Sequence, residues 1–188
     1  LRGTLQATAG DLDFSNLSDG DSIDIFADSV INASGAVTTT GERINGAFNL
    51  QIVSGGATTL QQIGNSTRLQ SLDVNSGGQL SLNGDISVDG GNIDLAGSAD
   101  VELTATVTLD TEVGNDENAG SVLFAAGGSL DSATNESLTV RTNLAGGGFD
   151  GGAVQFGNVG SNDPLATLTT QTAGDTGGGG TNGTATLN

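Results

Sequence analysis

Apolar residues recur along this chain in pairs separated by a single residue, and the spacing of these pairs is the strongest constraint on its fold. Three pairs return together at an offset of 21: Leu72/Val74 at Ile93/Leu95, Leu80/Leu82 at Val101/Leu103, and Ile86/Val88 at Val107/Leu109. Alternation with a period of two places both members of a pair on one face of a strand. Because three strands repeat at one common offset, the pattern predicts stacked coils of a three-sided parallel β-helix rather than independent hairpins.

A helical interpretation fits one segment only. Residues 98–113 contain neither glycine nor proline. However, apolar residues alternate from Val101 to Leu109, and threonine, which favours strands, fills many of the positions between them. The sequence therefore predicts an all-β chain that folds as a right-handed parallel β-helix, a solenoid with coils of about 21 residues.

Composition raises disorder as an alternative, since the chain carries 32 glycines and a formal net charge of −18 in 188 residues. Leucine, isoleucine, valine and phenylalanine nevertheless make up about a quarter of the chain, which is above the range of disordered sequences. These residues are also regularly spaced, so we expect the chain to fold. One coil cannot bury enough apolar surface to offset its ordering entropy, so stability must come from stacking on neighbouring coils.

A longer and looser repeat overlies the coils. Ile63-Gly64 matches Val159-Gly160 at an offset of 96, and the segment 10–14 resembles 120–124 at an offset of 110. The unequal offsets predict insertions, for which 115–119 and 145–152 are the candidates. The chain is thus interpreted as a single β-solenoid segment, 1–188, that contains nearly two units of about a hundred residues, approximately 1–109 and 110–188.

Missing residue types narrow the function. Cysteine, histidine, lysine, methionine, tryptophan and tyrosine are absent, and four arginines face twenty-two carboxylates. This charge excludes the basic footprint that nucleic acids require. No apolar run approaches the ~18 residues of a transmembrane helix. The absence of methionine predicts that the chain is a piece of a longer polypeptide.

The acidic residues suggest a metal site without completing one. The densest cluster, 19–24, could offer oxygen ligands to Ca²⁺, yet no twelve-residue calcium loop and no calcium-binding nonapeptide repeat follows it. The loop 115–118 has nothing near it in sequence that completes a site. We therefore predict no metal-binding residues and no cofactor, and we interpret the acidic surface as one that keeps a β-rich rod soluble.

Catalysis and ice binding are further alternatives. Parallel β-helices host polysaccharide lyases and hydrolases, and Asp85 with Asp89, or Asp94 with Glu102, could in principle act as acid and base. The chain has no histidine, lysine or tyrosine that could act as a base near neutral pH. We therefore predict no catalytic residues and no enzymatic activity. The segment 104–108 alternates threonine outward, as ice-binding solenoids do, but a 21-residue register places Ser87 and Asp89 beneath it and interrupts the ladder.

Several short motifs point to a family. They are Gly-x-Val-x-Phe at 120–124, Leu138-Thr139-Val140, Val154-Gln155-Phe156, and Val159-Gly160 followed by Leu165 and Leu168. Together they resemble the β-strand repeats of giant bacterial surface proteins, which are similar to filamentous-haemagglutinin and autotransporter passenger regions. The resemblance implies a structural stalk of a secreted or cell-surface bacterial adhesin, with neighbouring repeats of the same protein as its partners. A subunit that assembles end to end into an extracellular filament or sheath is the alternative, because solenoid ends expose unpaired strands.

Overall fold

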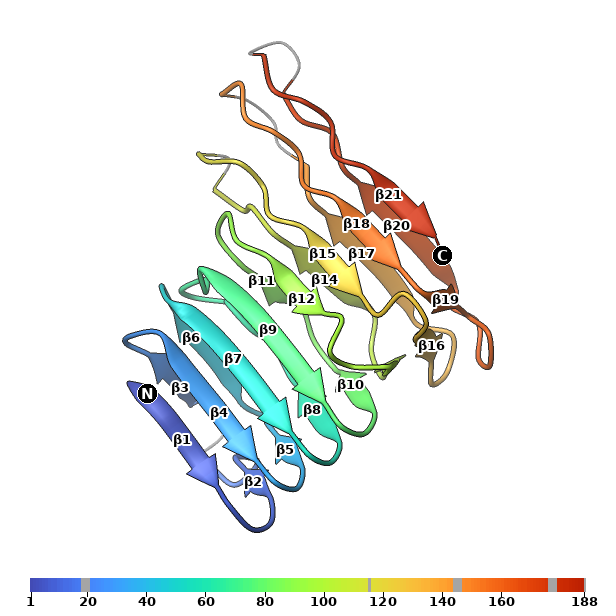
Figure 1. Ribbon diagram of the computed structural model, residues 1–188. Helices are drawn as coiled ribbons and strands as arrows, with labels where there is room; N and C mark the ends of the chain where they lie inside the picture. Colours follow the sequence, from blue (N-terminus) through green and yellow to red (C-terminus); the bar gives the residue numbers. More distant parts are fainter. Residues whose placement is uncertain (18–20, 115, 144–146, 176–178, 188) are drawn as a thin grey trace.

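The chain folds into a right-handed parallel β-solenoid whose strands stack along one axis, as the computed structural model shows in Figure 1. The structure describes residues 1–17, 21–114, 116–143, 147–175 and 179–187. No helix occurs among these residues, and so none that could cross a membrane. The all-β class and the parallel β-helix predicted from the paired apolar residues are both confirmed.

The first sheet runs the length of the molecule. Its strands, in spatial order, are β1 (Gly3–Ala7), β4 (Ser29–Ala33), β7 (Asn49–Ser54), β9 (Ser71–Ser76), β12 (Ile93–Leu95), β15 (Val122–Phe124), β18 (Val154–Phe156) and β21 (Ala185–Leu187). Each strand pairs in parallel with the next, so successive strands of the sheet come from successive coils.

The other two sides of the coil are built in the same way. The second sheet contains β2 (Leu12–Asp13), β5 (Val37–Thr38), β8 (Thr58–Leu60), β10 (Leu80–Leu82), β13 (Asp100–Leu103), β16 (Ser129–Ser132) and β19 (Asn158–Val159). The third side contains β3 (Ser22–Ile25), β6 (Arg43–Gly46), β11 (Ile86–Ser87), β14 (Val107–Asp110), β17 (Ser137–Arg141) and β20 (Thr167–Gln171). Single bridges from Ile63 to Ile44 and to Ile86 join the two parts of this third side.

Inward side chains form continuous apolar columns between the three sides. Leu50, Leu72 and Ile93 stack in register on the first sheet, and each is at most 1% exposed. Farther along, the rings of Phe124 and Phe156 stack with centroids 5.3 Å apart. This is the aliphatic interior that the alternating pattern predicts, and burial between coils supplies the stability that one coil lacks.

Coil length is not uniform. The first-sheet register pairs Ser29 with Leu50 and Leu72 with Ile93, an offset of 21 in both cases. The offset then grows to 29 where Ile93 pairs with Val122, and to 32 where Val122 pairs with Val154. The predicted coil length therefore describes only the coils between Ser29 and Ile93, where the offsets are 21 or 22, because the first coil pairs Gly3 with Ser29 at an offset of 26. The average is about 25 residues per turn. Most of the added chain lies between the third side and the next first-sheet strand, where the insertions were expected.

One predicted register is wrong. Ile86 lies opposite Leu109, an offset of 23, and not opposite Val107 as the common offset of 21 required. The other two strands keep the predicted register, with Ile93 opposite Leu72 and Val101 opposite Leu80. A two-residue slip leaves every inward side chain facing inward, so the hydrophobic pattern alone cannot distinguish the two offsets.

The longer repeat does not correspond to matching places on the coil. Ile63 bridges strands of the third side, whereas Val159, its match at an offset of 96, lies on the second sheet. Strand β14 also runs across the approximate boundary between 109 and 110. The division into two units stays a prediction from the sequence.

Candidate functional site: a carboxylate corner

Three carboxylates meet where the third side turns into the first sheet. Oxygen atoms of Asp89, Glu112 and Asp116 all lie within 4.8 Å of one another. Asp89 is half-buried, Glu112 is 3% exposed and Asp116 is exposed. We call these three residues the carboxylate corner. It is the only such group among the described residues.

Backbone contacts explain why these groups converge. Asp89 and Glu112 form an isolated antiparallel bridge, although β12, β13 and β14 all lie between them in the sequence. The lengthened connection after β14 then carries Asp116 back over the bridge, and the Asp116 N–H points to Oε1 of Glu112 at 3.5 Å. The hydroxyl of Thr111 donates to the carbonyl of Gly120 at 2.8 Å and closes this connection at its base.

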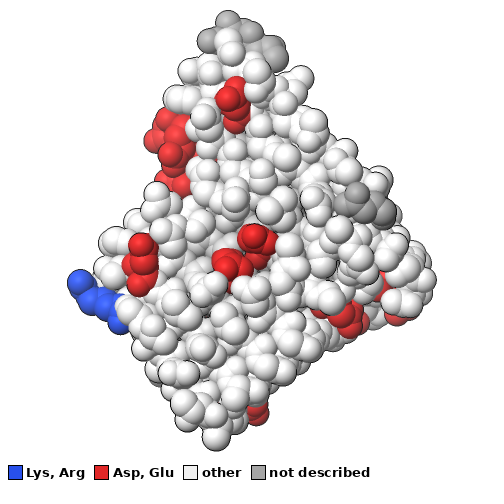
Figure 2. Space-filling model, in the orientation of Figure 1, with Lys and Arg blue, Asp and Glu red and all other residues white. Residues whose placement is uncertain are grey.

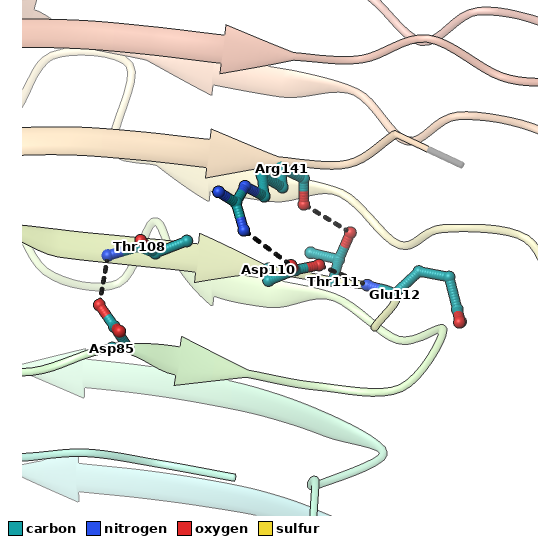
Figure 3. A network of polar contacts seen from close by, with 6 residues as sticks. All are labelled: Asp85, Thr108, Asp110, Thr111, Glu112 and Arg141. Carbon is teal, nitrogen blue, oxygen red and sulfur yellow. Dashed lines mark hydrogen bonds and ion pairs between the residues drawn. The ribbon is translucent and has the colours of Figure 1, made fainter. Parts of the chain in front are cut away.

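A polar network anchors the corner to the adjoining coils (Figure 3). Asp110 accepts the Glu112 N–H at 3.2 Å and lies 3.9 Å from a guanidinium nitrogen of Arg141, one coil further on. Burial raises the pKa of the Asp110 carboxyl, and the Glu112 N–H and the guanidinium groups of Arg141 and Arg68 oppose that rise. Half of the Arg141 side chain is exposed, so the ion pair contributes little to stability.

The corner offers hard oxygen ligands, but only part of a set. Ca²⁺ takes six to eight oxygen atoms, whereas these side chains offer three carboxylates. From the sequence we predicted no metal ligands, because no residue close to the loop 115–118 along the chain completes a site. Asn115 lies outside the described residues. The fold brings Asp116 beside Asp89, although Asp89 lies a whole coil earlier in the chain. Only the coil register could have revealed that proximity.

The other acidic candidates are kept apart or bound to the backbone. Asp94 belongs to the first sheet and Glu102 to the second, so the fold does not pair them. Asp85 accepts the Thr108 N–H of the next coil at 2.7 Å, while Asp89 joins the carboxylate corner. In the cluster 19–24, the first two residues lie outside the described ones, and Asp24 accepts a hydrogen bond from the Ser22 hydroxyl.

Many carboxylates hold neighbouring coils together. Four aspartates, three between strands and one on β16, accept backbone N–H groups from the following coil: Asp11 from Ala36 at 2.7 Å, Asp28 from Asn49 at 3.1 Å, Asp131 from Asn162 at 3.0 Å and Asp150 from Thr181 at 2.7 Å. The hydroxyl and N–H of Thr181 hold the pKa of Asp150 below its ordinary value. Part of the acidic composition therefore has a structural role.

The outward threonines form a larger array than the sequence predicted. Thr108 stands in register with Thr139 and Thr169 on three successive coils. The corrected register places Asp85 below Thr108, and the Asp85 carboxylate accepts the Thr108 N–H. The row of threonines therefore ends at Asp85 on that side, and not at Ser87 as the 21-residue register predicted. Arg141 pairs with Gln171 at the end of the same strands.

Comparison with known proteins adds no assignment. No protein-family model, no curated protein and no solved structure matches this chain.

Proposed function

We propose that this chain is a structural stalk segment of a large secreted or cell-surface bacterial adhesin, acting outside the cell and without catalysis. The observation that carries the proposal is that polar side chains of the chain bind one coil to the next. Aspartates such as Asp28 and Asp131 bind the backbone of the adjacent coil, as suits a stack that must resist being pulled apart. Acidic groups are also dispersed over the face seen in Figure 2 rather than gathered around a cleft.

Continuity along the axis supports the same proposal. Parallel pairing joins all eight described strands of the first sheet, and the inward apolar columns run through them as one cluster. A repeat stack of this kind extends by adding coils, each in contact only with its neighbours. Its neighbours in the whole protein would be further repeats of the same kind.

A self-assembling extracellular filament subunit is the second candidate, because a parallel stack of coils grows by adding strands at its edges. Leu12 and Ile23 are only partly buried at one end, as is Leu168 at the other, where Leu187 is 70% exposed. Strands β20 and β21 are almost wholly exposed there. Edges of this type accept another strand unless they are covered.

Sedimentation and electron microscopy of the purified chain over a concentration series separate the two. A stalk segment stays monomeric, and a filament subunit grows into continuous fibres. Fibres at every concentration would contradict the stalk proposal. Incubation with acidic and neutral glycans tests the absence of catalysis, and the cleavage of any glycan, lost on Asp89→Asn, would overturn it.

A further inference from the structure

Two phenyl rings stand exposed along one corner of the solenoid. Phe26 is 53% exposed and Phe48 is 38% exposed, and both lie in the corner that joins the third side to the first sheet, in successive coils. The next coil places Gln70 opposite Phe48, where its N–H donates to the Phe48 carbonyl. Exposed aromatic surface costs solvation free energy, so paired rings mark a binding surface more often than scattered apolar residues do.

The two rings border a hollow of about 440 Å³. We call it the phenyl groove. Its polar wall comes from Asp24 on β3, Asn45 on β6, and Ser66 and Thr67 of the following coil. Ligand sites of proteins combine aromatic surface with a few placed polar groups in this way.

One ring of the phenyl groove already contacts a cation of the chain itself. The guanidinium carbon of Arg2 lies 5.7 Å from the centroid of the Phe26 ring, within the range of a cation–π contact. No comparable contact engages Phe48 among the described residues. The Arg2 contact shows which chemistry these ring faces accept.

Both signs of charge occur along the same corner, where Arg2 and Arg68 stand against Asp24, Asp89 and Glu117, so the attraction for a positive partner comes from the chain as a whole. Ala47 lines both the phenyl groove and a second hollow of about 190 Å³, bordered by Arg68, Asp89 and Glu117, which leads toward the carboxylate corner. The whole chain carries a net charge of −18, so its field steers cations toward it. Arginine suits such a groove better than lysine, because guanidinium is more weakly hydrated and stacks on aromatic faces.

From these contacts we infer that the phenyl groove binds an extended basic peptide segment, with an arginine side chain laid on the exposed face of Phe48 and its charge balanced by Asp24. The coil spacing of about 4.8 Å places the Phe26 and Phe48 positions within the reach of two or three extended peptide residues. This inference concerns a partner of the stalk and holds whether the chain is a monomer or a filament.

Fluorescence anisotropy with a labelled, end-blocked arginine–glycine peptide measures the binding directly. Phe48→Leu keeps the apolar volume but removes the ring face, and it should weaken binding about two- to fivefold, the range of an exposed cation–π contact. The same peptide with glutamine in place of arginine should not bind. Full affinity of Phe48→Leu, or equal binding of the two peptides, would overturn the inference.

Two matched pairs separate a site from diffuse attraction. Asp24→Asn and Asp94→Asn each remove one negative charge, and only the first should weaken binding appreciably. Arg2→Gln and Arg141→Gln each remove one positive charge, and the first should tighten binding more, because it frees the face of Phe26. Equal effects within each pair would contradict the phenyl groove as the site and assign the binding to net charge. Thermal melts of every variant confirm that it folds.

Discussion

The hydroxyl of Thr142 donates a hydrogen bond to the backbone carbonyl of Gly152 at 2.6 Å, in the buried base of a lengthened corner. Thr111 makes the same contact with Gly120 one coil earlier. The repeated pair shows how the solenoid accommodates long connections: a threonine directly after the third strand ties down the glycine at which the next coil begins.

Thr142→Val should therefore destabilise the protein by about 1–3 kcal/mol, because it keeps the shape of the side chain and leaves the Gly152 carbonyl without this donor. Urea unfolding measures the change. Thr139→Val, on the outward face of the same strand region, is the matched control and should change the free energy of unfolding by less than about 0.5 kcal/mol. Equal losses in the two variants would show that the corner contact is not special.

Glycines stack at the start of the first-sheet strands because nothing larger fits. A Cβ built on Gly152 would lie 1.8 Å from the carbonyl oxygen of Gly120, and one on Gly183 would lie 1.8 Å from that of Gly152. Gly152→Ala should cost more than about 2 kcal/mol, since backbone must move to admit the methyl group. Gly127→Ala has open space around it and should be nearly neutral. Comparable stability of both variants would refute the close stacking.

Asp131 should link stability to acid pH. Burial acts to raise the pKa of Asp131, but hydrogen bonds from Asn162 and Asp163 outweigh it and hold the pKa below its ordinary value. A lowered folded-state pKa contributes stability above the unfolded pKa of about 3.9, and this is lost as pH falls through the lower folded pKa.

Asp131→Asn should accordingly be less stable than the parent by about 1–2 kcal/mol at pH 7, and the difference should shrink below pH 4. Chemical denaturation at pH 7, 5 and 3 measures it. Asp94→Asn removes the same charge from a carboxylate whose hydrogen bond among the described residues is within its own turn, from the Ala96 N–H, and it should have the smaller effect at pH 7. A gap between Asp131→Asn and the parent that widens in acid has the wrong sign for this mechanism.

The corrected register of the third side is testable with cysteine pairs, because the chain has no cysteine of its own. Ser87 lies directly opposite Asp110. Ser87→Cys with Asp110→Cys should form a disulfide on mild oxidation, whereas Ser87→Cys with Thr108→Cys, the pair that a 21-residue offset would align, should not. The opposite outcome in mass spectrometry would restore the uniform register.

The sequence predicted the class of fold because period-two alternation determines which side chains face inward. Leu80 and Val101 show this, because the 21-residue spacing of their apolar pairs correctly predicted that they lie opposite each other. It could not predict the Ile86–Leu109 register, because a two-residue slip preserves the alternation. Nor could it predict the carboxylate corner, whose members meet through corner geometry that leaves no hydrophobic signature. The exposure of Phe48 was likewise invisible, since the pattern of an apolar residue next to a strand is the same as that of a core residue.

Distances along one outward column of the first sheet test the solenoid most directly. The column stands in continuous register and contains Val30, Gln51, Asp73, Asp94, Leu123 and Gln155. Spin labels at Gln51 and Gln155 span four strand spacings, or about 19 Å, and labels at Val30 and Gln155 span five, or about 24 Å. Double electron–electron resonance should give two narrow distributions that differ by about one strand spacing. Broad distributions, or two distances without that increment, would contradict the parallel stack.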